Sequence, residues 1–285
     1  MNETIKEIPL DELHPFPDHP FGVRNDEAMQ QTVESIREYG VLVPAIARPL
    51  EDGTYELISG HRRKHACELA GLETMPVIVR DLDRNAAIII MVDSNLQREN
   101  ILPSERAKAY KMKLEAIKRQ GARHDLTSDQ LGQKSSGKTS REMIAENSPD
   151  SATQIQRYIR LTELEPQLMQ MVDEGKIGMT PAVEISYLNP GEQKLLIETI
   201  DSEQAIPSLS QAQRMKRLSQ EGKLNDDSML GIMIEQKKPE KWDLKLPMNK
   251  IQKYFPRSYT PQRMEETIIK LLDMWMKKRQ RDQQR

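Results

Sequence analysis

The chain has 285 residues, of which 30% are charged and only 4% are aromatic, and its formal net charge is −2. This length predicts two or three domains, and the hydrophobic content of 37% favours an extended, helix-rich protein over one compact globule. The composition excludes a membrane-spanning protein, because no apolar run approaches roughly eighteen residues. It also excludes an internal disulfide, because Cys67 is the only cysteine. Since the N-terminus carries no signal-peptide pattern, we expect a cytoplasmic protein.

Short strands and helices alternate over residues 1–82, which predicts a small α+β domain. Asp26 is placed to cap a helix that reaches Tyr39 and stops at Gly40. The Asp-Gly pair at 52–53 is typical of a hairpin turn. We expect strands over three runs, at residues 43–48, 55–58 and 76–80.

The most informative motif of this domain is Gly60-His61-Arg62-Arg63, the first arginine cluster. It follows a strand and opens a helix that Gly71 closes. Backbone N–H groups at a helix start point outward, and guanidinium groups bind phosphate oxygens in pairs. A nucleotide or a nucleic-acid phosphate is therefore the natural ligand. The alternative is that these arginines only pair with surface carboxylates such as Glu68 or Asp93.

A second arginine cluster, Asn95-Leu96-Gln97-Arg98, adds an amide and an arginine just before Pro103 opens a new helix. From residue 85 onward the pattern is almost entirely helical. We expect helices over 86–93 and 103–120, the second ending at Gly121. The polar stretch that follows, up to Thr139, predicts a flexible loop.

Two capping boxes then occur close together, Thr139-Ser140-Arg141-Glu142 and Ser151-Ala152-Thr153-Gln154. They predict two short helices, at about 140–147 and 152–161, with Ile155 packing the second helix on the first. This is the spacing of a helix-turn-helix, although Ser148-Pro149 replaces the usual Leu-Gly of such turns.

The second of these helices presents polar side chains that are able to contact bases or phosphates. Together with its cap, the expected DNA-binding residues are Ser151, Thr153, Gln154, Gln156, Arg157 and Arg160. The alternative is an ordinary helical hairpin, because short capped helices are common.

The C-terminal residues 241–285 contain twelve Lys and Arg against five Asp and Glu. Such an excess suits nucleic-acid contact, although solvated helix faces often have it too. Thr260-Pro261 predicts the start of a terminal helix. Its apolar residues form one stripe, which predicts a core face or a dimer seam: Met264, Ile268, Leu271, Leu272 and Trp275.

Two other patterns match known sites without their usual context. Residues 132–139 fit the P-loop pattern GxxxxGK[ST], but the preceding residues 123–130 are polar and cannot form the buried strand that a P-loop requires. His61 and His65 are one helical turn apart, but neighbouring arginines would repel a metal cation. We interpret neither pattern as a site.

Taken in order, the motifs resemble those of the ParB/RepB family of partition proteins over about residues 5–190. The family's N-terminal box is similar to residues 40–44, and its G-E-R-R-x-R-A box to residues 60–66. Its E-N-x-Q-R box is similar to residues 94–98. The residues that fill these boxes, together with Asp18-His19-Pro20-Phe21, are similar to those of family members carried on plasmids and integrative elements.

The resemblance implies an α+β N-terminal domain of the ParB/sulfiredoxin-like fold, then an all-α helix-turn-helix domain and a helical C-terminal module. The corresponding domains are residues 1–102, 103–238 and 239–285, with the helix-turn-helix at about 140–161. The last of these is expected to serve dimerisation or DNA contact.

In function, the resemblance implies a homodimeric, CTP-gated clamp that loads at a specific DNA site and then slides along double-stranded DNA non-specifically. Such a protein serves the segregation of a plasmid, chromosome or mobile element, associates with the bacterial nucleoid, and has a ParA-type ATPase as a possible partner. CTP would bind with Mg²⁺. By position, the nucleotide-binding residues would be Gly60, His61, Arg62, Arg63, Asn95, Gln97 and Arg98, with Asn95 also helping to hold Mg²⁺.

The departures from the family pattern bear on catalysis. Ser94 stands where the family has an acidic residue, so we expect CTP hydrolysis to be slow or absent. His61 and His65 replace the usual Glu and Arg. The alternative function is a nucleotide-independent helix-turn-helix transcriptional regulator. A nuclease, a third class, would need a metal-carboxylate cluster that the sequence does not display.

Overall fold

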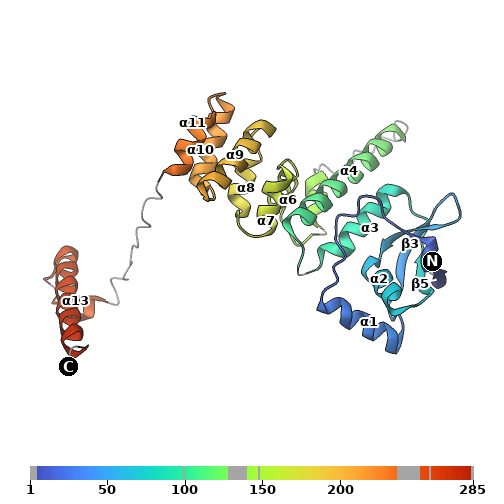
Figure 1. The fold of residues 1–285 in the computed structure, drawn as a ribbon, viewed down its shortest axis with the longest axis horizontal. Helices are drawn as coiled ribbons and strands as arrows, with labels where there is room; N and C mark the ends of the chain where they lie inside the picture. The colour runs from blue at the N-terminus through green and yellow to red at the C-terminus, as the bar shows by residue number, and fades with distance from the viewer. Residues whose placement is uncertain are drawn as a thin grey trace. The chain divides into compact units, whose positions relative to one another are not determined.

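The computed structural model describes residues 5–98, 100–127, 140–146, 148–235, 251–256 and 258–283. It divides into two compact units, Met1–Glu235 and Gln236–Arg285 (Figure 1). Within the described ranges, no helix combines the length and the apolar character needed to cross a bilayer.

The N-terminal part of the first unit is built on a five-stranded sheet of order β1-β5-β3-β4-β2. The strands are β1 (Ile5–Pro9), β2 (Leu13–Pro15), β3 (Ala45–Pro49), β4 (Tyr55–Ser59) and β5 (Thr74–Val79). The pairs β1–β5 and β3–β4 are antiparallel, whereas β3–β5 and β2–β4 are parallel. The three expected strands are confirmed within a few residues, and β1 and β2 are additions to them.

Two helices, α1 (Glu27–Tyr39) and α2 (His61–Ala70), contact each other beside this sheet (Figure 1). Asp26 caps α1 as expected, because its Oδ1 accepts a hydrogen bond from the Met29 amide at 2.9 Å. Met29 and Cys67 pack in one core with the inward side chains of the central strands. The predicted α+β domain is therefore confirmed, with Gly40 and Gly71 at the helix ends.

A second core joins this domain to the helices that follow, α3 (Arg84–Leu96) and α4 (Pro103–Thr127). The prediction that α4 ends at Gly121 is wrong, since the helix continues to Thr127. A glycine inside a helix costs only about 1 kcal/mol relative to alanine, so it does not compel an end. Because α3 and α4 share a core, the expected domain boundary at 102/103 falls inside one compact unit and stays a prediction.

Seven further helices are described in the first unit; the first of them packs in the second core, and the other six contribute to a third apolar core. They are α5 (Ser140–Glu146), α6 (Ala152–Leu161), α7 (Pro166–Asp173), α8 (Met179–Ile185), α9 (Pro190–Glu203), α10 (Leu209–Gln220) and α11 (Asp226–Ile234). The two helices of the expected helix-turn-helix, α5 and α6, are confirmed as helices, and Ile155 is fully buried between them and α4. The P-loop match at 132–139 lies outside the described residues.

The second unit contains the short 3₁₀ helix η2 (Gln252–Tyr254) and the long helix α13 (Pro261–Gln283). Thr260 caps α13, because its Oγ1 accepts the Arg263 amide at 3.4 Å. Of the expected apolar stripe, Met264 is buried, whereas Leu272 and Trp275 are each 58% exposed. The described part of the chain therefore does not cover this stripe, and the dimer seam stays a prediction.

Candidate functional site

The first arginine cluster begins at a turn that only glycine fits. Gly60 has φ +113°, in the left-handed region, and it lies against strand β3. A Cβ built on Gly60 would lie 2.8 Å from the Cβ of Ala45 and 3.3 Å from its Cα. The turn leads directly into the first backbone N–H groups of α2, and N–H groups at a helix start are able to bind an anion.

The two arginines of this cluster have different partners. Arg62 forms an ion pair with Asp26, the cap of α1, at 2.8 Å. Arg63 donates to the backbone carbonyls of Val43 and Pro44, so its guanidinium is held by the loop before β3. Arg62 thus faces the α1 side, where a ligand has access, and Arg63 supports the loop.

Glu68 and Asp93, the carboxylates named as alternative partners of these arginines, form ion pairs with lysines instead. Glu68 forms an ion pair with Lys64 at 2.8 Å, and Asp93 forms one with the buried Lys113. Neither carboxylate therefore pairs with a cluster arginine. The alternative itself, pairing with a surface carboxylate, holds for Arg62, whose partner Asp26 is exposed.

The structure brings the two arginine clusters together at one pocket of about 560 Å³. Arg62 and Arg98 both line it, and Arg24 adds a third guanidinium. The full lining is Phe21, Gly22, Arg24, Asp26, Ala28, Thr32, Arg62, Arg98, Asn100, Ile101 and Glu105. Three arginines against two carboxylates leave this cationic pocket (the name used below) with an excess of positive charge.

Arg98, like Arg24, makes no polar side-chain contact within the described part of the chain. Burial lowers the pKa of its guanidinium, the nearby Arg62 lowers it further, and Glu105 raises it. An anionic ligand between Arg62 and Arg98 would offset their mutual repulsion and favour the charged form of both.

The rest of the second arginine cluster does not reach the pocket. Asn95 is buried, and its Nδ2 donates to the Met91 carbonyl at 2.8 Å. Ser94 donates to the same carbonyl at 3.0 Å, and Gln97 is exposed at the C-cap of α3. Asn95 therefore supports the helix in this structure.

The residues assigned to Mg²⁺ do not form a ligand set. Asn95 is directed into its own helix, and the adjacent Asp93 is paired with Lys113. Across the described residues, no group of three or more His, Cys, Asp or Glu is placed to hold a metal ion. A metal bound together with a nucleotide would have to take most of its ligands from phosphate oxygens and water.

The imidazole of His61, within the first cluster, lies against that of His19 with the two rings tilted, a contact not foreseen from the sequence. The rings of His19 and His61 are 3.8 Å apart between centroids, and His61 Nε2 accepts the Phe16 amide at 3.4 Å. Burial, together with His19, Arg98 and Lys64, lowers the pKa of His61 to about 3. His61 is therefore neutral at physiological pH. The ParB/RepB family, which the sequence resembles, has a negatively charged glutamate at this position.

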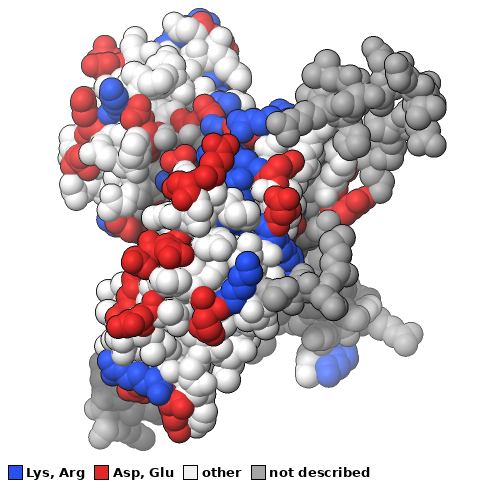
Figure 2. Space-filling model, turned by 90° about the vertical axis from the view of Figure 1, so that its right-hand side faces the viewer, with Lys and Arg blue, Asp and Glu red and all other residues white. Residues whose placement is uncertain are grey.

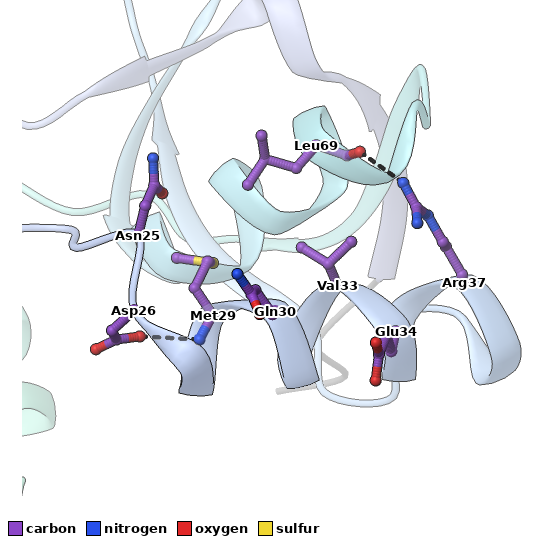
Figure 3. A pocket seen from close by; sticks show the side chains of 8 residues that line it. All are labelled: Asn25, Asp26, Met29, Gln30, Val33, Glu34, Arg37 and Leu69. Atoms are coloured by element: carbon purple, nitrogen blue, oxygen red, sulfur yellow. Dashed lines mark hydrogen bonds between the residues drawn. The ribbon is translucent and has the colours of Figure 1, made fainter.

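A second hollow of about 410 Å³ lies between α1 and α2 (Figure 3). Asp26 lines both this hollow and the cationic pocket. Met29, Val33 and Leu69 form its apolar part, and Arg37 closes one end by donating to the Leu69 carbonyl at 3.1 Å. Asp26, the ion-pair partner of Arg62, therefore belongs to the walls of both the hollow and the cationic pocket.

The turn of the helix-turn-helix is held by a buried tyrosine of α4. The Tyr110 hydroxyl lies 2.5 Å from Ser148 Oγ and donates to Asp150 Oδ2 at 2.6 Å. Arg106, one turn earlier, donates to the same carboxylate oxygen at 3.3 Å and lies over the Tyr158 ring. The Ser-Pro turn is therefore compatible with the motif, because α4 supplies the contacts that fix it.

The expected DNA-binding residues of α6 fall into two groups. Thr153 and Gln156 are exposed, and Gln154 is half-buried. Ser151 caps α6 by accepting the Gln154 amide at 3.2 Å, and Arg157 donates to Thr180 Oγ1 at 2.7 Å.

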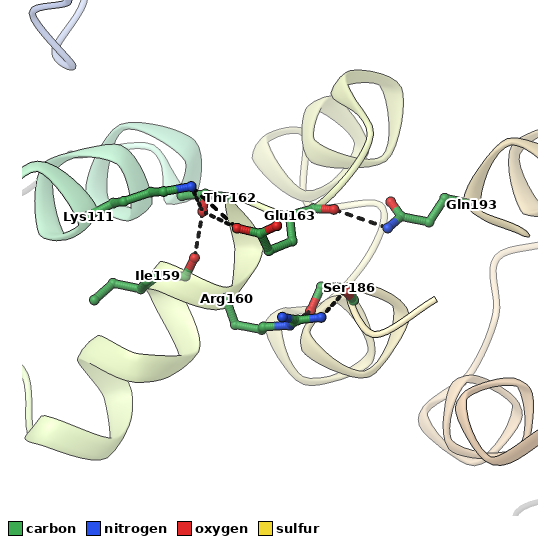
Figure 4. Close-up of polar contacts among 7 residues, drawn as sticks. All are labelled: Lys111, Ile159, Arg160, Thr162, Glu163, Ser186 and Gln193. Carbon is green, nitrogen blue, oxygen red and sulfur yellow. Dashed lines mark hydrogen bonds and ion pairs between the residues drawn. The ribbon is translucent and has the colours of Figure 1, made fainter. Parts of the chain in front are cut away.

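Arg160 forms the most extensive set of contacts (Figure 4). It donates to Ser186 Oγ at 3.1 Å and to the Ser186 carbonyl at 2.6 Å, and its guanidinium lies 4.2 Å from the Tyr187 ring centroid. Lys216 lies 3.8 Å from the same ring centroid. Arg160 therefore fixes α6 against α8 in this structure and is not free to reach a base.

On the face drawn in Figure 2, Lys and Arg side chains are interspersed with Asp and Glu side chains. The cationic pocket follows the same pattern, since Asp26 and Glu105 lie among its arginines. The sequence did not indicate either carboxylate as part of a site. It predicted Asp26 only as the cap of a helix.

Comparison with known proteins gives consistent results. The family model of the ParB N-terminal domain matches residues 1–96. Stage 0 sporulation protein J of Bacillus subtilis is 34% identical over 218 residues, which cover 73% of this chain and 70% of that protein. Chromosome-partitioning protein Spo0J of Thermus thermophilus is 30% identical over 189 residues, which cover 66% of this chain and 62% of that protein.

Among solved structures, the chain is similar to the C-terminally truncated chromosome-partitioning protein ParB from Caulobacter crescentus complexed to the centromeric parS site. The TM-score is 0.44 at 24% identity, over 74% of this chain and 98% of that chain. For the same protein complexed with CTP-gamma-S, the TM-score is 0.32 at 27% identity, over 67% of this chain and 96% of that chain.

Proposed function

This chain belongs to the ParB/Spo0J family of partition proteins, and on that premise we propose that it binds a specific DNA site and serves the segregation of a chromosome, plasmid or mobile element. The helix pair α5–α6, with α6 capped by Ser151 and the turn between the helices held by Tyr110, supports this role. In this proposal the exposed Thr153 and Gln156 contact bases, and Arg157 contacts a phosphate after releasing Thr180.

The cationic pocket is, in our proposal, the site for CTP. The observation that carries the proposal is that Arg62 and Arg98, from two separate motifs, line one pocket of about 560 Å³. Guanidinium groups and the N–H groups at the start of α2 suit a triphosphate, and a related ParB was solved with CTP-gamma-S. Arg62 would exchange Asp26 for a phosphate oxygen.

We further propose a homodimeric clamp that CTP gates at the DNA site, with hydrolysis slow or absent. Ser94 donates to its own helix, and Asp93 is held by Lys113, so neither is placed to activate a water. A ParA-type ATPase is the expected partner in segregation. The exposed apolar stripe of α13 is the candidate dimerisation surface, and the cytoplasmic nucleoid is the expected location.

Cysteine crosslinking tests the gating. Cys67 is fully buried, so a single cysteine introduced on the exposed side of α4, at Lys108 or Glu115, is the reactive one in each protomer. A bifunctional maleimide should crosslink one or both positions more strongly when CTP and specific DNA are both present. Equal crosslinking with and without CTP at both positions would argue against a nucleotide gate.

One observation favours a second function, a nucleotide-independent transcriptional regulator. His61 is neutral where the family has an acid, and Arg62 is already paired with Asp26. In that case Arg62→Ala would leave operator affinity and the length of DNA covered unchanged. Under the clamp proposal, the variant still binds the specific site but loses CTP-dependent spreading.

A further inference from the structure

A carboxylate of α4 lies in the cationic pocket and has no part in the phosphate site proposed above. Glu105 is in the first turn of α4, and its Oε1 accepts a hydrogen bond from the Gly22 amide at 2.8 Å. Its Oε2 accepts a second one from the Leu102 amide at 3.2 Å. One side chain thus connects the loop after β2 with the start of the helix that follows the N-terminal domain.

The surroundings of Glu105 are those of a bound anion. Burial lowers the pKa of both Arg98 and His19, and the negative charge of Glu105 opposes this lowering, so Glu105 favours the charged form of both groups. Backbone amides and a guanidinium are also the donors that bind a phosphate. A triphosphate between Arg62 and Arg98 would place a second anion within reach of the same donors.

From this geometry, and resting on the proposed nucleotide site, we infer that Glu105 is an internal anion that a nucleotide phosphate displaces from the Gly22 and Leu102 amides. Two negative groups cannot share these donors without repulsion, so binding of the phosphate disfavours the Glu105 contacts. Occupancy of the pocket then releases the first turn of α4 from the loop. Glu105 is therefore a positioning residue that reports nucleotide binding to α4.

The release has a direct route to the DNA-binding helices. Arg106 follows Glu105 in α4, and Tyr110 lies one turn further on. These two side chains hold Asp150 and Ser148 in the turn of the helix-turn-helix. A shift of the start of α4 would therefore reach the turn before α6 through one continuous helix.

An interaction that the nucleotide must break opposes nucleotide binding. Removal of that interaction should therefore increase the affinity for CTP. Glu105→Gln keeps an oxygen that can accept the Gly22 amide, but it removes the charge that competes with phosphate. We expect calorimetric titration to show CTP binding about fivefold or more tighter than in the wild type, the lower end of usual couplings between sites.

Asp173→Asn is the matched control. Asp173 also accepts an amide in the first turn of α4, that of Ser104 at 2.9 Å, but it lies on α7 and does not line the cationic pocket. Loss of its charge should leave CTP affinity unchanged. An equal gain in both variants would overturn the inference, since a general loosening of α4 would then explain it.

Hydrogen exchange of the wild-type protein gives a second measurement that needs no variant. Saturating CTP should increase exchange in peptides that contain the Leu102 amide, because this amide loses its acceptor, while peptides from β3 stay unchanged. Unchanged exchange at Leu102 together with clear calorimetric CTP binding would overturn the inference and leave the proposed function intact. Absence of CTP binding to the wild type would instead overturn the proposed function, and the inference with it.

Discussion

The cationic pocket and the second helix of the helix-turn-helix both present arginines, but these arginines are held in different ways. In the pocket, Arg62 has one exposed ion pair, and Arg98 has no hydrogen-bonded partner among the described residues. On α6, Arg160 is fixed by Ser186 and by stacking on Tyr187. An arginine can therefore be assigned to a ligand only when its partners in the unliganded fold are known.

Gly60→Ala should have the largest effect, because it alters the backbone on which the pocket is built. The alanine would carry a Cβ at φ +113° and 2.8 Å from Ala45 Cβ. Backbone strain and overpacking each cost about 1 to 3 kcal/mol, so we expect a loss of about 2 to 6 kcal/mol in the free energy of unfolding, measured by urea titration.

Gly53→Ala is the control for that change. Gly53 also has positive φ, at +86°, but a Cβ there would meet no atom within 4 Å. The strain alone should cost about 1 to 2 kcal/mol. An equal loss in the two variants would contradict the close approach to Ala45.

Tyr110→Phe should destabilise the helix-turn-helix without touching the pocket. The change leaves Ser148 and Asp150 without their shared partner in a half-buried place. We expect a loss of about 1 to 3 kcal/mol in stability, and weaker binding to specific DNA at 25 °C, with CTP affinity unchanged. Tyr39→Phe, at an exposed position on α1, is the matched control and should behave as the wild type.

Arg160→Met and Thr153→Ala should separate support of α6 from contact with DNA. Arg160→Met removes two hydrogen bonds to Ser186, so it should lower stability by about 1 kcal/mol and weaken specific binding through the angle of the helix. Thr153→Ala should leave stability within about 0.5 kcal/mol and weaken binding to the specific site alone. Loss of DNA binding by Arg160→Met with full stability would mean that Arg160 reaches the DNA after all.

The smallest effect concerns the pH dependence of stability. The pKa of His61 is lowered to about 3 in the fold, whereas an unfolded histidine titrates near 6.5. Below pH 6.5 the unfolded state therefore takes up a proton that the folded state does not bind, and stability falls as the pH decreases. Between pH 7 and pH 5.5, we expect His61 to account for about 1 kcal/mol of the loss, seen as a flatter pH profile in His61→Gln. Parallel profiles would show that His61 becomes protonated without unfolding.

Local signals in the sequence were sufficient for most helices. Asp26 and Ser151 cap the helices that they were expected to cap, because a cap acts within its own first turn. Strands β1 and β2 were not foreseen, since they are short and are stabilised by pairing with β5 and β4, which are distant in the sequence. The expected end of α4 at Gly121 was wrong because a glycine weakens a helix without ending it.

For the site, the sequence indicated the arginines but not what surrounds them. Asp26, Glu105 and His19 come from segments that only the fold brings next to Arg62 and Arg98. The commitment of Asn95 to its own helix could not be read from its motif either. The assignments to nucleotide, metal and DNA remain predictions.

Calorimetric titration of CTP into the wild-type protein and the double variant Arg62→Ala/Arg98→Ala tests whether the cationic pocket binds the nucleotide. Arg119→Ala, an exposed α4 position outside the pocket, serves as the control, and ATP serves as the competing nucleotide. We expect the wild type and Arg119→Ala to bind CTP equally and to prefer it to ATP, and the double variant to lose at least about tenfold in affinity, or 1.4 kcal/mol. Equal CTP binding by all three proteins, or no binding by the wild type, would contradict the claim that the cationic pocket is a nucleotide site.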